Sequence, residues 1–270
     1  PGRHAAFAVF TARKRLQARS YDLIHCWSAQ SLGSATLAML LAPSVPRVVT
    51  VSELPTARQS HWARFLSGER NTRTTYLPIS NTIRRELLTH GVSESAVHVL
   101  RPGIDMGLVD RSQREALREE WGIASNTTVV GLLGDPIEDV NGLHAYMTIG
   151  LANEAMRTEN RQLALVVHSH QVERLQATTV SRHLNQFEMI VVDDRIACPW
   201  KTLPACDIAM TIGPQAGHLS LLWAMAAGVP ITGDASYAVS EIVEDHHSAL
   251  LARPGVPKAL SHRVTQLVED

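Results

Sequence analysis

The sequence predicts an α/β fold with two domains, each built from parallel strands and crossover helices. Short apolar runs rich in strand-forming residues alternate with segments of helical periodicity along the chain. The runs are apolar at nearly every position, as expected when helices cover both faces of a parallel sheet. One turn-rich segment, Arg101–Asp110, interrupts the alternation, which restarts near Val129.

Ten apolar runs have the length and composition of strands. In chain order they are Asp22–Cys26, Arg47–Val51, Tyr76–Ile79, Val97–Leu100, Thr128–Leu133, Leu163–Val167, Met189–Val192, Ile208–Thr211, Val229–Thr232 and Ala249–Leu251.

Nine segments between these runs have a helical period. Start and stop signals support three of them: Ser80 before the third, a capping box that begins at Ser112 before the fourth, and Gly228 after the seventh. In chain order the helices are Ala5–Arg19, Leu32–Leu41, Thr82–Thr89, Gln113–Trp121, Gly142–Arg157, Ser181–Asn185, His218–Ala227, Ser240–Asp245 and Val256–Val268.

The interruption at Arg101–Asp110 predicts a boundary between domains of residues 1–106 and 107–270. A chain of 270 residues with 45% hydrophobic content can bury the cores of two modest domains. Ligands of such domains bind at the carboxyl ends of the strands, so two facing domains would form a natural cleft for a nucleotide.

Composition excludes several classes of function. Lys and Arg number 25 against 26 Asp and Glu, so no overall positive charge attracts nucleic acid or an anionic bilayer. Cys26, Cys198 and Cys206 have neither an even count nor a zinc or redox spacing, which predicts unpaired thiols and a cytoplasmic location. No membrane span or signal peptide is recognisable. No G-x-G-x-x-G follows a strand, which disfavours an α/β oxidoreductase.

Six fragments of the chain, in order and in register, resemble the motifs of the family 4 (group 1) retaining glycosyltransferases. Three lie in the first domain and three in the last third of the chain. They are Asp22-Leu-Ile-His25, Ser80 with Arg84, Arg101-Pro-Gly-Ile-Asp105, Ala205-Cys-Asp-Ile-Ala-Met-Thr211, Leu222-Trp-Ala-Met-Ala-Ala-Gly-Val-Pro-Ile231, and Glu241-Ile-Val-Glu-Asp245 with Ala249-Leu-Leu251.

The resemblance implies a GT-B fold, in which two Rossmann-like domains face a cleft. It also implies an incomplete first domain, because the family's opening βα units do not precede the helix at Ala5–Arg19. The start at Pro1, rather than Met, suggests a fragment with both ends clipped. By resemblance the protein is a hexosyltransferase that uses a UDP-, GDP- or ADP-sugar and no further cofactor.

The charged residues that the family uses on its donor are replaced in this chain. The diphosphate-binding Arg and Lys of the family fall on Asp135 and on Asn141, or on Val140 after a one-residue shift. The family's two Glu residues, separated by seven positions, fall on Gln215 and Trp223. The indole of Trp223 either packs in the core or stacks on a flat ligand. Loss of a donor to a leaving oxyanion weakens transfer.

Other donor-side features are kept in sequence. The turn before His218–Ala227 opens a helix whose free N–H groups can hold phosphate, although an ordinary strand-to-helix turn fits as well. Glu241 matches a nucleotide-side position or simply starts a helix. The donor-binding candidates are Gly134, Gly217, His218, Leu219, Ser220 and Glu241.

The resemblance places the acceptor at the first domain. His25 is either a catalytic residue or a structural strand-end histidine. Basic segments near Arg13–Arg19 and Arg58–Arg73 suggest peripheral membrane contact or solvated helix faces. Two histidine pairs, His168 with His170 and His246 with His247, lack a third metal ligand, so no metal site is expected. The acceptor-side candidates are His25, Trp27, Ser52, Glu53, Ser80 and Arg84.

Two functions therefore compete. The first is sugar transfer from a nucleotide-sugar to a glycan or lipid-linked acceptor. The second is that of a pseudoenzyme, a non-catalytic descendant that binds a nucleotide, a glycan or a protein. Fold does not decide between them. The residues assign neither the acceptor nor an oligomeric state.

Overall fold

A computed structural model describes residues 15, 21–27, 45–52, 73–134, 139–157, 161–169, 190–213 and 218–269, with the side chains of 139–142 and 218 left out. The chain divides into two compact units, Pro1–Pro102 and Gly103–Asp270. The boundary predicted from sequence lies four residues after this division. The predicted helices Leu32–Leu41 and Ser181–Asn185, and Ala5–Arg19 apart from Arg15, lie outside the described residues.

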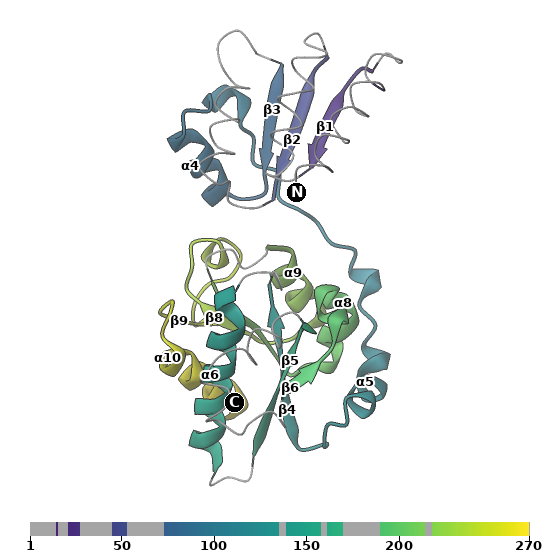
Figure 1. Cartoon of the computed structure of the whole chain (residues 1–270), viewed down its shortest axis with the longest axis vertical. Coiled ribbons are helices and arrows are strands. Elements are labelled where there is room, and N and C mark those ends of the chain that lie inside the picture. The colour runs from purple at the N-terminus through teal and green to yellow at the C-terminus, as the bar shows by residue number, and fades with distance from the viewer. Residues whose placement is uncertain are drawn as a thin grey trace. The chain divides into compact units, whose positions relative to one another are not determined.

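The described part of the N-terminal unit holds a parallel sheet of order β1-β2-β3, formed by Ile24–Trp27, Arg47–Val51 and Thr74–Pro78 (Figure 1). Helix α4 (Asn81–Thr89) follows β3, and its first turn is capped as predicted, because the Ile83 N–H donates to Ser80 Oγ at 3.1 Å. The turn η2 (Glu94–Ala96) comes next. The core cluster among the described residues of this unit is apolar, and the buried Arg47 donates from its Nε to Thr74 Oγ1.

The C-terminal unit holds a six-stranded parallel sheet of order β6-β5-β4-β7-β8-β9. Strands β4, β5 and β6 follow one another toward one edge of the sheet, and β7, β8 and β9 follow one another toward the other edge. The strand order therefore reverses between β4 and β7. In doubly wound sheets ligands bind at the carboxyl ends of the strands beside this reversal. The strands are β4 (Thr127–Leu133), β5 (Gln162–Val167), β6 (Ile190–Val192), β7 (Ile208–Thr211), β8 (Ile231–Asp234) and β9 (Leu250–Ala252).

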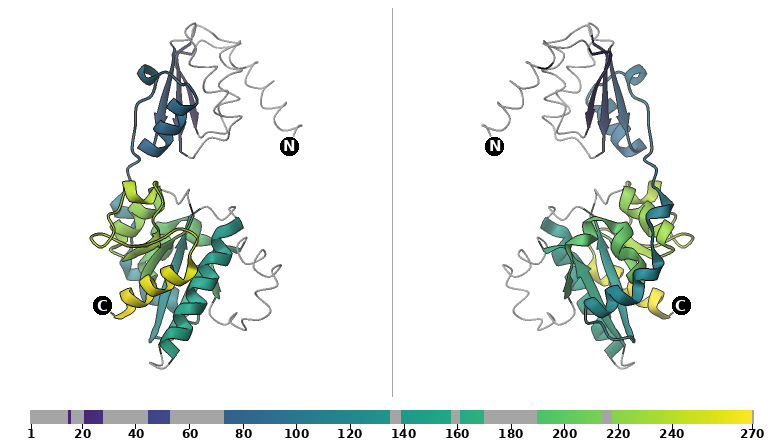
Figure 2. Two further views of the ribbon diagram at one scale, coloured as in Figure 1. Left: turned by 90° about the vertical axis from the view of Figure 1, so that its left-hand side faces the viewer. Right: turned by 90° about the vertical axis from the view of Figure 1, so that its right-hand side faces the viewer.

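Helices cover both faces of this sheet, as the apolar strands predicted (Figures 1 and 2). Buried side chains form two clusters, one that includes residues of α9 and the turn η8 and one that includes residues of α6 and α10. Among the described helices, none combines the length and apolar character that crossing a membrane requires. The helices are α5 (Arg114–Glu120), α6 (Asp139–Met156), α8 (Pro199–Thr202), α9 (His218–Ala227) and α10 (Pro257–Glu269), with turns η3 (Met106–Leu108), η4 (Arg111–Gln113), η7 (Asp194–Ala197), η8 (Leu203–Ala205) and η9 (Val239–Glu241).

Two element predictions were wrong. The run Val97–Leu100 forms no strand of its own, although Val97 makes a single parallel bridge to Tyr76. The helix expected at Ser240–Asp245 is reduced to the short turn η9, because the Glu244 N–H donates to Ser248 Oγ at 2.9 Å and draws the chain into a turn. His246, which lies between Glu244 and Ser248, has a left-handed backbone with φ 59°.

Two end signals of helices had opposite outcomes. The capping box at Ser112 was wrong, because Asp110 accepts the Ser112 N–H at 2.9 Å and starts η4, so that α5 begins at Arg114 without a side-chain cap. The stop at Gly228 is confirmed. Gly228 has φ +64°, and the Val229 N–H donates back to the Ala224 carbonyl at 3.0 Å.

A carboxylate at the amino end of β7 ties α5 to the sheet. Asp207 accepts the Val129 N–H at 2.7 Å and pairs with both Arg114 and Arg118. Arg118 is buried and also donates to the Ala205 and Thr127 carbonyls. Asp207 therefore joins β4, β7 and α5 at one point, where most of its hydrogen-bonding capacity is used.

The three cysteines are all described and none forms a disulfide. Burial raises the pKa of Cys206 to about 12, so its thiol stays protonated. Its sulfur lies close to β4: a Cβ added to Gly131 would stand 2.9 Å from Cys206 Sγ. The absence of a side chain at Gly131 thus makes room for this thiol.

Gly233 in β8 likewise allows a close approach to β7. A Cβ at this position would lie 2.2 Å from the Thr211 carbonyl oxygen. We expect Gly233→Ala to force the two strands apart and to lower the free energy of unfolding by about 1–3 kcal/mol, measured by urea denaturation. Gly103→Ala is the control, because no atom lies within 4 Å of the Cβ it would add. Equal midpoints for the two variants would contradict this account of Gly233.

Candidate functional site

Two glycine turns stand at the carboxyl ends of the strands that flank the reversal in strand order. Gly134 follows β4 with φ +125°, and Gly213 follows β7 with φ +96°. Residues with a side chain rarely adopt this backbone conformation. A Cβ added to Gly134 would meet no atom within 4 Å, so the conformation, and not crowding, explains this glycine. Both turns therefore present their backbone where ligands of doubly wound sheets bind.

Asp234 ends β8 beside the turn at Gly213. Its side chain is buried, with a relative exposure of 2%, and Oδ2 accepts the Gly213 N–H at 3.1 Å. Burial raises the pKa of Asp234, and hydrogen bonds from the backbone of Gly213 and Gly255 together with the nearby His144 oppose this rise. The carboxylate of Asp234 thus holds the turn at Gly213, and it lies near Gly255, which belongs to a different part of the chain.

His144 on α6 is the second buried polar group at this place, with a relative exposure of 7%. Its Nε2 atom and Asp234 Oδ1 have no hydrogen-bond partner among the described residues. An electrostatic interaction links the two side chains. Sequence reasoning missed both residues; the only signal was a carboxylate at the end of an apolar strand.

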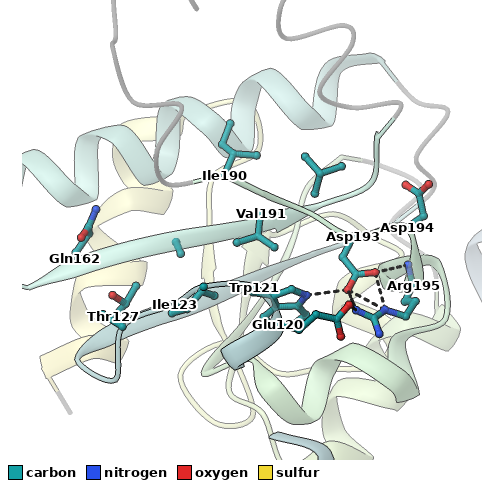
Figure 3. A pocket seen from close by; sticks show the side chains of 14 residues that line it. Glu120, Trp121, Ile123, Thr127, Gln162, Ile190, Val191, Asp193, Asp194 and Arg195 are labelled. Atoms are coloured by element: carbon teal, nitrogen blue, oxygen red, sulfur yellow. Dashed lines mark hydrogen bonds and ion pairs between the residues drawn. The ribbon is translucent and has the colours of Figure 1, made fainter. Parts of the chain in front are cut away.

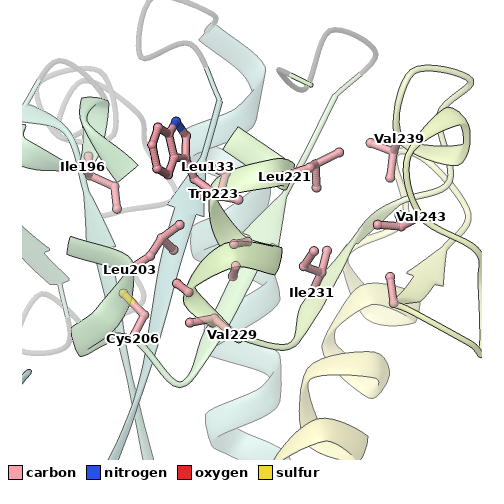
Figure 4. Close-up of a cluster of buried hydrophobic side chains, with 14 of the residues drawn as sticks. Leu133, Ile196, Leu203, Cys206, Leu221, Trp223, Val229, Ile231, Val239 and Val243 are labelled. Carbon is pink, nitrogen blue, oxygen red and sulfur yellow. The ribbon is translucent and has the colours of Figure 1, made fainter. Parts of the chain in front are cut away.

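Trp223 packs in the core of the C-terminal unit. Its relative exposure is 7%, and it belongs to the cluster of buried apolar side chains in Figure 4. Its ring lies against Trp200, with centroids 5.1 Å apart at 44°. Of the two alternatives that the sequence left open, core packing is the one observed. Helix α9 consequently offers no carboxylate at this position and no exposed indole for stacking.

The structure describes only some of the other donor-side candidates. Leu219 is exposed at 45%, whereas Ser220 and Glu241 are partly buried, and Glu241 lies in η9. Asn141 and His218 lie in α6 and α9, with their side chains undescribed. Three candidates fall outside the described residues: Asp135, Gln215 and Gly217.

The acceptor-side candidates divide into two groups. At the end of β1, His25 Nε2 lies 2.8 Å from Thr50 Oγ1, and its ring stands 4.5 Å from that of Trp27. Trp27 is 68% exposed and Ser52 is exposed as well, so this edge offers an aromatic surface beside a hydroxyl. Glu53 lies outside the described residues.

Ser80 and Arg84 have local partners. The Ser80 hydroxyl caps α4, and Arg84 Nη2 pairs with Glu94 Oε1 at 2.5 Å on the surface. Neither contact involves the end of β1. The structure therefore gives both side chains a structural use and brings neither into the His25 and Trp27 cluster.

A pocket of about 670 Å³ lies apart from these turns, along the edge strand β6 (Figure 3). Its walls come from the end of α5, the first residues of β4 and β5, and residues Ile190–Arg195. Asp193 accepts the Trp121 Nε1–H at 2.8 Å and pairs with Arg195, which also binds Glu120. Burial opposes ionisation of Asp193, yet these hydrogen bonds hold its pKa below the usual value. The charged groups of this wall therefore pair with one another.

Within the two histidine pairs, the described residues His168 and His246 lie beside other polar side chains. His168 Nδ1 lies 3.4 Å from Asp194 Oδ1, which also accepts the Ser169 N–H. His246 Nε2 lies 3.1 Å from Arg263 Nη2, a cation that disfavours a metal ion beside it. In the described ranges no three His, Cys, Asp or Glu side chains gather in the manner of a metal site.

Comparison with known proteins identifies the fold and the N-terminal domain. Residues 1–108 match the family model described as Glycosyltransferase Family 4. A search of curated proteins found no significant match. Solved structures match over nearly the whole chain. HepE from Anabaena, in complex with UDP and glucose, has 18% identity and a TM-score of 0.75, over 98% of this chain and 71% of HepE.

Two further structures agree. A glycosyltransferase from Rickettsia africae has 14% identity and a TM-score of 0.75, over 97% of this chain and 72% of its own. WaaG, a glycosyltransferase involved in lipopolysaccharide biosynthesis, has 14% identity and a TM-score of 0.71, over 97% and 86%. The predicted α/β fold of the GT-B type is therefore confirmed. Residues 1–108 match the Glycosyltransferase Family 4 model, and the chain as a whole has the fold of the GT-B glycosyltransferases.

Proposed function

We propose that this protein transfers a sugar from a nucleotide-sugar donor to an acceptor, with the donor bound by the C-terminal unit. The observation that carries this proposal is the pair of left-handed glycine turns, Gly134 and Gly213, at the reversal in strand order of a GT-B fold. The family match of residues 1–108 and the UDP bound to the similar HepE support it.

We place the donor diphosphate at the turn after β7. Helix α9 begins five residues after Gly213, and the first turn of a helix has free N–H groups and a positive partial charge. A departing nucleoside diphosphate gains negative charge, which such fixed dipoles stabilise. In this chain the backbone would supply part of what arginine and lysine supply in the family. Retention of the sugar's anomeric configuration is implied by the family resemblance.

Because Trp223 packs in the core, we expect sugar transfer to be slow. The family carboxylate at this position is replaced by an indole in the core, so α9 cannot bind donor hydroxyls through that side chain. This observation also favours a second candidate function, binding of a nucleotide-sugar without turnover. The two candidates differ in one measurable quantity, the release of free nucleotide.

On the acceptor side we place the exposed Trp27 and the neighbouring His25, which offer an aromatic face and a polar edge to a glycan or a lipid-linked sugar. The three unpaired cysteines support a cytoplasmic location. Peripheral membrane contact of this unit is part of the same proposal and rests on the basic segments of the sequence.

A panel of UDP-, GDP- and ADP-sugars tests the proposed function. We expect one of them to raise the melting temperature and to release nucleotide slowly when an acceptor mixture is present. At a ligand concentration about 100 times Kd the stabilisation is about 2.7 kcal/mol, which a thermal scan resolves. Stabilisation without release would replace transfer by binding. Failure of every donor to stabilise the protein would overturn both candidate functions.

Gly213→Ala locates the donor within this panel. The substitution strains a turn with φ +96°, and we expect it to abolish the thermal shift. Gly122→Ala is the matched control, because Gly122 has φ +66° at the end of α5, away from the carboxyl ends of the strands. An equal loss of the shift in both variants would show that general strain, and not the donor turn, is responsible.

A further inference from the structure

We propose that Asp234 is a positioning residue for the donor diphosphate: its carboxylate fixes the backbone of Gly213 in the conformation that meets the nucleotide. This inference rests on the proposed function. Asp234 acts through the backbone, because only 2% of its surface is exposed and a ligand does not reach it.

The carboxylate of Asp234 lies beside two glycine turns and binds one of them directly. Oδ2 accepts the N–H of Gly213 at 3.1 Å, and the backbone of Gly255 is near enough to help lower the pKa of Asp234. Gly213 precedes α9, whereas Gly255, with φ +75°, precedes α10. Asp234 thus lies beside the residues that precede two helices on opposite faces of the sheet, and it binds the first of these residues directly.

The sheet fixes the position of the carboxylate itself. Asp234 is the last residue of β8, and the preceding Gly233 brings β8 so close to β7 that a Cβ there would lie 2.2 Å from the Thr211 carbonyl. The distance between the end of β8 and the turn after β7 is therefore rigidly determined. A carboxylate at the end of this strand transmits that rigidity to Gly213.

A packing role alone does not explain a carboxylate here. A buried polar group with unused hydrogen-bonding capacity lowers stability, and Asp234 Oδ1 and His144 Nε2 both have such capacity among the described residues. An apolar side chain would fill the same space at lower cost. What Asp234 adds is a specific acceptor for the Gly213 N–H, with His144 as the nearby group that favours its charged form.

The test compares the binding of UDP and uridine, measured by calorimetry. We expect Asp234→Ala to weaken UDP about tenfold, because the turn that meets the diphosphate loses its anchor, and to leave uridine within about twofold. Asp234→Asn keeps one acceptor and is expected to recover most of the affinity for UDP. Asp245→Ala is the matched control, since Asp245 likewise accepts a backbone N–H, that of Leu251, but on the edge strand β9 and not at the turn after β7.

Hydrogen exchange of the peptides that contain Gly213 and Gly255 gives a second readout. Both peptides are expected to exchange faster in Asp234→Ala. At least one is expected to exchange faster in Asp234→Asn, so the asparagine variant still tests the proposal if the alanine variant does not fold. Unchanged UDP affinity, or an equal loss of UDP and uridine affinity in a folded variant, would overturn the positioning role. If the parent binds no nucleotide, the proposed function fails instead, and exchange at Gly213 still decides whether Asp234 holds the turn.

Discussion

Replacing Trp223 by glutamate is expected to destabilise the C-terminal unit by about 3–5 kcal/mol instead of restoring a donor-binding carboxylate. The indole packs against Trp200 inside an apolar cluster. Removing it leaves a cavity, and the new carboxylate is either buried without a partner or protonated. The sequence suggests that glutamate belongs here by family resemblance, whereas the packing places the side chain of Trp223 in the core.

Chemical denaturation followed by fluorescence measures this effect. Leu219→Glu is the control, because Leu219 lies on the exposed side of the same helix, and its substitution is expected to change stability by less than about 0.5 kcal/mol. If Trp223→Glu were as stable as the parent and released nucleotide faster, the indole would have to lie at the donor and not in the core.

The second large effect is expected at Asp207, where Asp207→Asn should cost about 3 kcal/mol of unfolding free energy. The substitution preserves the shape of the side chain but removes the charge that Arg114 and the buried Arg118 share. An uncompensated guanidinium is then left in a partly buried place. Glu94→Gln is the control, since it breaks only the exposed pair with Arg84 and is expected to cost less than about 1 kcal/mol.

The pH dependence provides an independent check of Asp207. Burial would raise its pKa, but the Val129 N–H and the two arginines hold the pKa below the usual value. A carboxylate with a lowered folded-state pKa contributes stability above its unfolded pKa of about 3.9, and that contribution disappears as the pH falls through the folded value. The stability difference between parent and Asp207→Asn should therefore be constant near neutral pH and shrink in acid. A constant difference down to acid unfolding would contradict the assignment.

Most of the described fold was predictable because parallel strands covered on both faces have a strong local signal. Ile208–Thr211 and His218–Ala227 have the bounds that the sequence predicted. The errors arose where a side chain competes for the backbone. Asp110 begins a tight turn before α5, and Ser248 holds the segment after η9 in a turn. Periodicity does not report such short-range hydrogen bonds.

The candidate site was less predictable, because its groups meet only in the folded sheet. Asp234, His144 and Gly255 come from β8, α6 and the turn before α10, and no spacing in the sequence connects them. Trp223 illustrates the same limit. Whether its indole faced the core or a ligand depended on Trp200, which a separate helix supplies.

The contact between Gly131 and Cys206 links two positions that are far apart in the sequence. A methyl group at 131 would stand 2.9 Å from the thiol sulfur, so the structure accommodates a side chain at 131 or the cysteine at 206, but not both. Descendants of this protein that gain a side chain at 131 would need a smaller residue at 206. The two sites should therefore vary together, as a pair of dependent mutations.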